Sequence, residues 1–419
     1  MTGLIHGPTI RAEDNSLLSK PGYDERTQLF FDNPNDLEYP ESFSALTKEE
    51  AHKSLNKLRH LVAEFNFVDK VDESVLLSCL LTTQIRKQIG KAPGFAPTAP
   101  DIGIGKSYVA DTVTVFATGQ LAEAISFSGS KDENSKVLLS TLIEGGAVIS
   151  FDNIDRPLHS ASLSSILTQE TYKGRIIGVS KMSRVRTDVT ILINGINLRL
   201  NADMARRILP IALQSSDKKF QRDACQYAYE NRVELNMAGL TIMAAYKAAG
   251  CPGLENLSNF SSYGEWSRWV RAPLVWLDMP DPCERLSWWS TFNYEKQLLT
   301  MVLHELYDFY GKFEDSKAIF SVKRLREDYK NNTQALHNIG SISSESGNNI
   351  NSRKLGILLN SKIGTVCEGL MLVSVGTYQG AMQYKVVATE AYVATPQLAL
   401  PDPDSSENSG AVIGVSIAV

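Results

Sequence analysis

The sequence lacks the features that mark secreted, zinc-stabilised and membrane-spanning proteins. Its five cysteines are scattered, without a Cys-x-x-Cys pair and without paired histidines, which argues against a zinc site or a disulfide framework. No apolar run reaches the roughly 20 residues that cross a bilayer, and the N-terminus lacks the apolar core of a signal peptide. We therefore expect a cytoplasmic protein with no membrane partner.

The chain also has no strong excess of charge. Its 419 residues include 47 Asp and Glu against 42 Lys and Arg, which gives a formal net charge of −5. A protein with this balance has no overall positive field that would attract nucleic acid, so any such surface must be local. The length predicts roughly two to four domains.

One stretch has the character of a phosphate-binding loop. Residues 100–107 read Pro-Asp-Ile-Gly-Ile-Gly-Lys-Ser, and two glycines let backbone N–H groups turn toward phosphate oxygens, while the lysine suits phosphate and the serine suits Mg²⁺. The expected nucleotide-binding residues are Gly103, Ile104, Gly105, Lys106, Ser107 and Tyr108. A solvated glycine-rich turn is the alternative, because Pro100 stands where the strict pattern has glycine.

Two later segments are typical of buried parallel strands that end in polar residues. Residues 147–152 end in Asp152, and residues 188–197 include Asn194 and Asn197. Since ligands bind at the carboxyl ends of such strands, Asp152 is expected to position Mg²⁺, and Asn194 or Asn197 to sense the γ-phosphate or orient water. The alternatives are a helix N-cap for the aspartate and an ordinary turn for the Asn-Gly pair.

Basic residues gather in the middle of this acidic chain. Between residues 171 and 207 there are eight Lys or Arg and two Asp or Glu. Arg206 and Arg207, expected on the first turns of a helix that starts near Asp203, suit a phosphate in a neighbouring subunit as an arginine finger; a surface ion pair is the alternative. Residues 175–186 alternate as a β-hairpin would.

We expect this basic hairpin to line a channel for a nucleic-acid backbone. The residues proposed to contact nucleic acid are Arg175, Lys181 and Arg184. The alternative is a solvated hairpin whose charges protect the edge of a sheet.

The predicted fold class is α/β, with a nucleotide-binding core between flanking helical domains and a small C-terminal module. The tryptophans at 266–289 are expected to pack in a core, and the C-terminal helix, helix, hairpin pattern suggests a winged helix. The predicted segments are 1–46, an extended acidic lead-in; 47–90, helical; 91–215, the core; 216–310, helical; 311–390, winged-helix-like; and 391–419, a flexible tail. Within 47–90, Thr47 is expected to cap the first helix, and a second apolar helix is expected over residues 73–89.

Together these motifs resemble the helicase end of phage- and plasmid-type primase–helicases, of the AAA+ and superfamily-three kind. Residues 99–107, 151–158, 195–198, 203–207 and 266–277 carry the resemblance, which extends over about residues 7–388. It implies an ATP- and Mg²⁺-dependent hydrolase that works as a homo-oligomeric, usually hexameric, ring on DNA. In this family Glu commonly follows the metal-side aspartate, whereas this chain has Asn153.

The resemblance assigns catalytic roles to particular residues. Lys106 and Ser107 would hold the triphosphate and Mg²⁺, Asp152 would be the metal-side acid, with Asn153 beside it, Asn194 or Asn197 would be the sensor, and Arg206 or Arg207 would reach a neighbour's site. We expect a DNA helicase or translocase acting on single-stranded DNA. The alternatives are an ATPase that acts on a protein partner through the acidic lead-in or tail, and an ATP-binding DNA adaptor with little hydrolysis.

Overall fold

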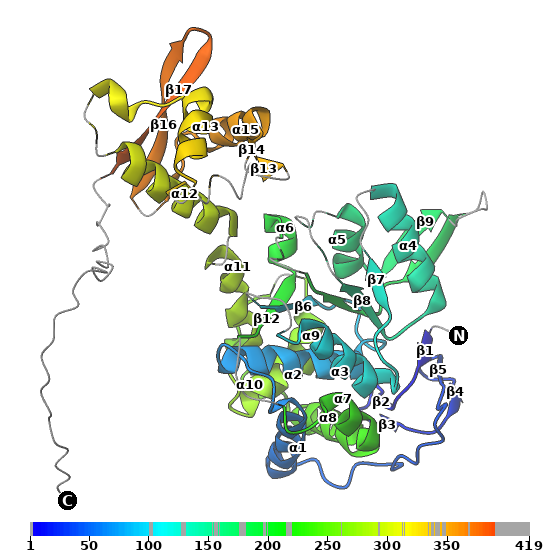
Figure 1. Cartoon of the computed structure of the whole chain (residues 1–419). Coiled ribbons are helices and arrows are strands. Elements are labelled where there is room, and N and C mark those ends of the chain that lie inside the picture. The colour runs from blue at the N-terminus through cyan, green and yellow to red at the C-terminus, as the bar shows by residue number, and fades with distance from the viewer. Residues whose placement is uncertain are drawn as a thin grey trace, which may run out of the picture. The chain divides into compact units, whose positions relative to one another are not determined.

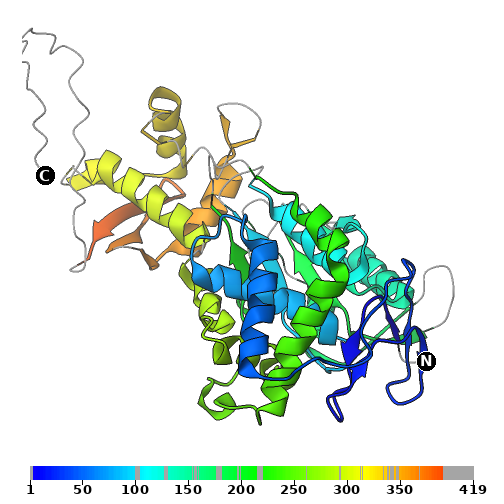
Figure 2. The same cartoon turned by 90° about the horizontal axis from the view of Figure 1, so that it is seen from below.

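The chain folds into two compact units, Met1–Tyr294 and Glu295–Val419. The computed structural model in Figure 1 and Figure 2 describes residues 3–389 except 100–103, 127–130, 153, 155–157, 159, 176–181, 196–197, 199, 215–219, 261, 292–293, 312, 314, 334, 337–338, 340–343, 346–348 and 368. Among the described helices, none is both long enough and apolar enough to cross a membrane.

The acidic lead-in is more ordered than its composition predicts. It forms five short strands: β1 (Gly3–Ile5), β2 (Thr9–Ile10), β3 (Leu17–Leu18), β4 (Gly22–Asp24) and β5 (Leu29–Phe31). Strand β5 pairs with β1 in parallel and with β4 in antiparallel register, and β2 pairs with β3. Ile10, Leu18, Leu29 and Phe31 are buried. Strands of two or three residues are too short to produce a recognisable alternation of apolar and polar residues, so they could not be predicted from the pattern.

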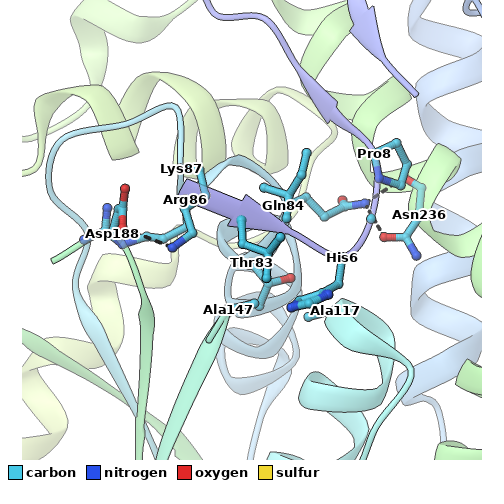
Figure 3. Close-up of a pocket in the computed structure, with 13 residues that line it drawn as sticks. His6, Pro8, Thr83, Gln84, Arg86, Lys87, Ala117, Ala147, Asp188 and Asn236 are labelled. Atoms are coloured by element: carbon cyan, nitrogen blue, oxygen red, sulfur yellow. Dashed lines mark hydrogen bonds and ion pairs between the residues drawn. The ribbon is translucent and has the colours of Figure 1, made fainter. Parts of the chain in front are cut away.

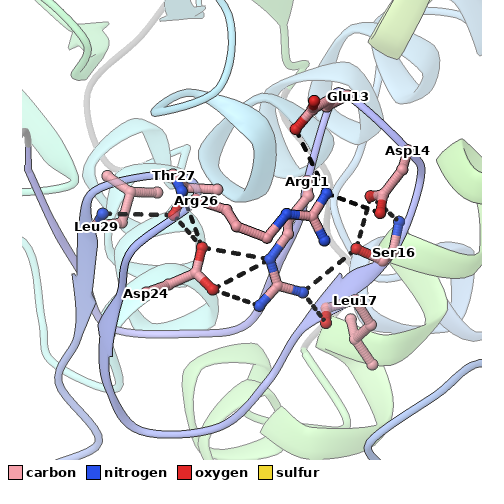
Figure 4. Close-up of polar contacts among 9 residues, drawn as sticks. All are labelled: Arg11, Glu13, Asp14, Ser16, Leu17, Asp24, Arg26, Thr27 and Leu29. Atoms are coloured by element: carbon pink, nitrogen blue, oxygen red, sulfur yellow. Dashed lines mark hydrogen bonds and ion pairs between the residues drawn. The ribbon is translucent and has the colours of Figure 1, made fainter.

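An ion-pair network fixes the turns of this segment (Figure 4). Arg11 donates from Nη2 to Oδ1 of Asp24 over 2.5 Å, and Thr27 donates to the same carboxylate from its N–H and its hydroxyl. The hydrogen bonds from Arg11 are the main reason that the pKa of Asp24 falls to about 2. The strand pair β2–β3 and the strand β4 are therefore tied together by charge as well as by packing.

Two helices follow, and both begin at capped residues. Helix α1 (Lys48–Val62) starts after Thr47, whose hydroxyl accepts from the N–H of Glu50 over 3.2 Å, which confirms the predicted cap. Helix α2 (Lys70–Ile85) starts after Asp69 in a capping box, three residues before the predicted start. Helix α1 packs against α8 (Arg232–Ala248), although the two lie far apart in the sequence.

A five-stranded parallel sheet forms the centre of the first unit (Figure 1). The strands run in the order β12 (Ile208–Ala212), β6 (Gly94–Thr98), β11 (Thr190–Ile193), β8 (Val148–Asp152) and β7 (Ala124–Ser126). Every pairing between them is parallel. The predicted α/β class is confirmed, and a central parallel sheet of this kind is consistent with a P-loop-like core.

Helices cover both faces of this sheet, and successive residues along its strands point alternately into two apolar cores. Phe95 and Leu192 face a core shared with α1, α2, α8 and α3 (Lys106–Thr118). Ala96 and Ile191 face the other core, with α4 (Lys131–Glu144) and α5 (Ala161–Thr168). A sheet buried on both faces is expected to read as near-continuous apolar strands, and this is the pattern from which the strands around Asp152 and Asn194 were predicted.

Further elements complete the first unit. Trp266 and Trp269 are buried, so the prediction that tryptophans pack in a core is confirmed for them. The elements are β9 (Thr171–Arg175), β10 (Met182–Arg186), α6 (Ala202–Ala205), α7 (Ala224–Glu230), α9 (Gly264–Trp266), α10 (Ala272–Trp276) and α11 (Trp288–Thr291), with a π-helical turn at Ser267–Arg271 and 3₁₀ turns at Leu254–Asn256 and Pro282–Ser287.

The second unit combines helices with a long hairpin. Phe320 forms an antiparallel bridge with Tyr384, so the short segment before α13 joins the sheet of β15, β16 and β17. The described elements are α12 (Tyr294–Tyr310), a 3₁₀ turn at Asp315–Ala318, α13 (Val322–Asn331), β13 (Ser344–Glu345), β14 (Asn349–Ile350), α15 (Ser352–Lys362), β15 (Val366–Cys367), β16 (Leu370–Tyr378) and β17 (Ala381–Ala388).

A buried carboxylate joins three elements of the first unit. Asp72, on α2, is fully buried. It accepts from the backbone N–H of Ala212 at the end of β12 over 2.8 Å and from Nε of Arg285 over 2.7 Å. The second carboxylate oxygen accepts from Nη2 of Arg285. Arg285 also donates from Nη1 to Oδ2 of Asp69 over 2.8 Å, but the side chain of Asp69 is 47% exposed, so Asp72 is the more deeply buried counter-charge.

We expect Asp72→Asn to lower the free energy of unfolding of the first unit by about 1–3 kcal/mol, because the buried Arg285 would lose two charge-assisted hydrogen bonds and keep Asp69, which is 2.8 Å away and 47% exposed, as its counter-charge. All five tryptophans lie in this unit, so their emission during urea unfolding reports it alone. Asp278→Asn is the matched control, since Asp278 is 80% exposed and 3.9 Å from Lys48. Equal unfolding midpoints for the two variants would contradict the prediction.

Candidate functional site

The predicted phosphate-binding loop leads into α3 through a glycine that the backbone requires. Gly105 has φ +95°, in the left-handed region, and is the residue before the first helical residue, Lys106. A side chain there would be strained. Ile104 and Lys106 are half-buried. Of the predicted site residues, Gly103, Asn153, Lys181 and Asn197 lie outside the described residues.

The structure brings Ser107 and Asp152 together, although 45 residues separate them. The hydroxyl of Ser107, on the first turn of α3, donates to Oδ2 of Asp152, the last residue of β8, over 3.2 Å. Both side chains offer oxygen atoms, which are the ligands that Mg²⁺ prefers. The pair thus fits a magnesium ion beside the positive end of a helix.

A second carboxylate, Asp111, stands one turn further along α3. Residues four apart share a helix face, so Asp111 lies on the same side of α3 as Ser107. Burial removes water from the charged form of this carboxyl group and raises its pKa, and the negative charge of Asp152 raises the pKa further. Sequence reasoning missed Asp111, although its spacing from Ser107 was the signal that could have found it.

Asn194 occupies the neighbouring strand end. Its backbone N–H donates to the carbonyl of Phe151 over 2.8 Å, directly before Asp152, and its side chain is 3% exposed. Gly195 packs so closely against Ile154 that a Cβ atom added to Gly195 would lie 2.2 Å from the carbonyl oxygen of Ile154. The Asn-Gly pair is therefore a tightly packed strand end rather than an exposed turn, and it puts Asn194 beside Asp152.

Arg206 and Arg207 lie elsewhere. They directly precede β12, and the carbonyl of Arg207 accepts from the N–H of Gly94, the first residue of β6. Both arginines therefore stand at the amino edge of the parallel sheet, whereas Asp152 and Asn194 stand at its carboxyl edge. Strands of this length, at about 3.3 Å per residue, separate the two edges by about 16 Å.

The two arginines also differ from each other. The side chain of Arg206 is 64% exposed and pairs with Asp203 over 2.6 Å. Arg207 is 16% exposed and donates to Asp203 and to both the hydroxyl and the carbonyl oxygen of Ser164 on α5. The expected helix near Asp203 is the single turn α6, and Arg206 ends it rather than lying on its first turns.

The basic hairpin is present as β9 and β10, shifted from the predicted bounds. Lys173 and Arg175 on β9 and Arg184 and Arg186 on β10 are exposed, while Tyr172 and Val185 face the core. Lys173 lies directly opposite Arg184 in the antiparallel register. Like charges that face each other across a hairpin destabilise it. The positive charges on the exposed face therefore do not contribute to the stability of the hairpin.

A cavity with a mixed lining of charged, polar and apolar residues lies at the amino edge of the sheet (Figure 3). Its lining includes Ala147 and Asp188, which precede β8 and β11. Asp188 pairs with Lys87 over 3.1 Å, and burial lowers the pKa of that lysine. The same cavity is lined by Ala117, at the far end of α3, so α3 extends from one edge of the sheet to the other.

The comparisons with known proteins leave the family open. No protein-family model matches the sequence, and no curated protein matches it. Among solved structures, the chain is similar to an active helicase, the SCCmec type IV Cch protein, at 13% identity and a TM-score of 0.38 over 92% of this chain and 79% of that one. It is also similar to the apo NrS-1 C-terminal region, at 12% identity and a TM-score of 0.34 over 86% of this chain and 80% of that one.

A third similar structure is the JCV helicase, at 12% identity and a TM-score of 0.26 over 56% of this chain and 69% of that one. With TM-scores below 0.5, these likenesses establish neither a family nor a function for this chain.

The different surroundings of the two arginines predict different effects on stability. We expect Arg207→Ala to lower the free energy of unfolding by about 1–3 kcal/mol, because it removes the three hydrogen bonds that this largely buried guanidinium donates to Ser164 and Asp203. Arg206→Ala should change it by less than about 1 kcal/mol, because an exposed ion pair contributes little. Tryptophan emission during urea unfolding measures both, and an equal loss for the two variants would be the contrary result.

Proposed function

We propose that this chain is an ATP-hydrolysing motor that acts on DNA as an oligomer, a helicase or translocase. The observation that supports the proposal most strongly is the hydrogen bond from Ser107 to Asp152. It joins the start of the glycine-preceded helix α3 to the carboxyl end of a central parallel strand, and this is where ligands bind in such sheets.

Each residue at this edge has a proposed part in hydrolysis. Ile104, Gly105 and Lys106 would bind the phosphates, with Ser107 and Asp152 holding Mg²⁺, which neutralises charge on the phosphates when bound. Asn194 would hold the attacking water in place. Tyr108 would contact the nucleotide beyond the phosphates. Gly103, proposed from the sequence to bind phosphate, and Asn153 and Asn197, proposed to act beside Asp152 and Asn194, lie outside the described residues.

The positions of the two arginines are the reason for proposing an oligomer. Arg206 and Arg207 lie at the opposite edge of the sheet from Asp152, so neither is placed to contact a nucleotide bound by its own chain. We propose that Arg206, the exposed one of the two, contacts the nucleotide of an adjacent copy in a ring, and that Arg207 holds the turn that presents it. A hexamer is the ring size that the sequence resemblance implies.

DNA contact would come from the hairpin. Arg175 and Arg184, with Lys181 outside the described residues, would bind the phosphates of a single strand, since cations that track a backbone provide sequence-independent affinity. In the second unit, the order of α12, the Phe320 bridge, α13, α15 and the hairpin β16–β17 supports the proposal of a winged-helix module.

The ATPase proposal predicts that Lys106→Ala lowers the rate of ATP hydrolysis by about 100-fold or more, the usual effect of losing one group that stabilises transition-state charge. The rate is measured as phosphate release from Mg·ATP by the full chain. Lys53→Ala is the control, since Lys53 is 70% exposed on α1. Unchanged hydrolysis by Lys106→Ala would exclude this loop as the hydrolytic site.

The DNA proposal predicts that single-stranded DNA speeds hydrolysis and that the double variant Arg175→Ala/Arg184→Ala loses this stimulation but keeps the basal rate. The affinity of this variant for single-stranded DNA should fall less steeply with salt concentration, by the amount expected for the loss of about two phosphate contacts. Lys20→Ala/Lys53→Ala, which removes two exposed cations elsewhere, should behave as the unchanged chain. Hydrolysis that is indifferent to DNA would instead favour a motor that acts on a protein.

A further inference from the structure

An exposed aromatic ring stands beside the proposed phosphate site. Phe220 is 52% exposed, and its ring meets the ring of Tyr108 edge-to-face, with centroids 5.8 Å apart and planes at 62°. Phe65 completes the group, 5.7 Å from Tyr108 and 6.4 Å from Phe220. Two separate parts of the chain therefore bring aromatic rings to Tyr108, the residue that directly follows Ser107.

This group is held in place by polar contacts around it. The hydroxyl of Tyr108 donates to Oδ1 of Asp223 over 2.9 Å and accepts from the N–H of Ala224 over 2.5 Å. The carboxylate of Glu64 accepts from the N–H of Gln221 over 2.6 Å. Gln221, which directly follows Phe220, is thus held by a hydrogen bond, and Phe220 stands with about half of its surface in solvent.

An aromatic ring held in this way is suited to bind another flat ring. A single exposed phenylalanine is common on protein surfaces, but Phe220 belongs to a cluster of three aromatic rings beside the proposed phosphate site, and aromatic rings pair favourably with other flat rings. Tyr108 is two residues from Lys106 on the first turn of α3, so the ring that Phe220 contacts lies within one helical turn of the residues proposed to hold the phosphates. A nucleotide bound there by its phosphates extends its sugar and base away from that turn.

We propose that Phe220, supported by Tyr108 and Phe65, is the platform on which the base of the bound nucleoside triphosphate stacks. The proposal rests on the nucleotide site proposed above. Stacking uses the face of the base and not its hydrogen-bonding edge, so the ring contributes affinity to any nucleobase. The phosphates and the base are then held by different residues, and their contributions to binding can be separated.

The test compares two ligands on the full chain, a non-hydrolysable ATP analogue and inorganic tripolyphosphate, each with Mg²⁺ and measured by calorimetry. Phe220→Ala should weaken binding of the analogue by about 5- to 150-fold, the range found when a stacked base loses its aromatic partner. Its affinity for tripolyphosphate, which has no base, should be unchanged. Phe220→Trp should keep the affinity for the analogue.

Phe30→Ala is the matched control, because Phe30 is a 38% exposed phenylalanine on β5, and it should bind both ligands normally. Equal weakening of both ligands by Phe220→Ala, or weakening of neither, would overturn the proposal, as would a changed oligomeric mass of the ligand-free variant. Failure of the nucleotide site itself gives a different result, because the unsubstituted chain would then bind neither ligand and Lys106→Ala would have no effect.

Discussion

The candidate site depends on how helix α3 is held at both of its ends. At the far end, the buried guanidinium of Arg232 donates to the carbonyls of Phe116 and Ala117, over 3.4 and 2.8 Å, and the amide of Asn236 donates to Phe116 over 3.3 Å. Carbonyls at a helix C-terminus have no partner within the helix, so a cation there stabilises it. Burial lowers the pKa of Arg232, yet such a group stays charged at any pH the protein meets.

This anchoring explains why so many distant residues matter to one helix. Arg232 and Asn236 belong to α8, and α8 packs against α1, whose following residues bring Phe65 to the first turn of α3. Arg232 also donates to the carbonyl of His6 in the lead-in, so the N-terminal strands are tied to the same helix. A shift of α3 along its axis would therefore disturb contacts at both edges of the sheet, and the position of Ser107 is fixed by the packing of the whole unit.

A feature of the fold or of the site could be predicted from the sequence where neighbouring residues determine it. The turn at Gly105, the strand that ends in Asp152 and the cap at Thr47 are set by neighbouring residues, and the structure has all three where the sequence predicted them. The hydrogen bonds that hold Arg207 could not be predicted, because Ser164, which accepts them, is 43 residues away in the sequence. The same holds for Phe220 and Tyr108, since only the fold makes them neighbours.

The charges at the carboxyl edge give a physical reason why one copy of the chain would be an incomplete catalyst. Asp111 and Asp152 lie close enough that the charge of Asp152 helps raise the pKa of Asp111, so this edge favours a cation even before a triphosphate arrives. Two carboxylates offset the charge of a divalent metal, which leaves Lys106 and the positive end of α3 to face the phosphates. An additional cation at this edge would stabilise the charge that develops during phosphoryl transfer, and under the proposed function Arg206 of an adjacent copy would supply it.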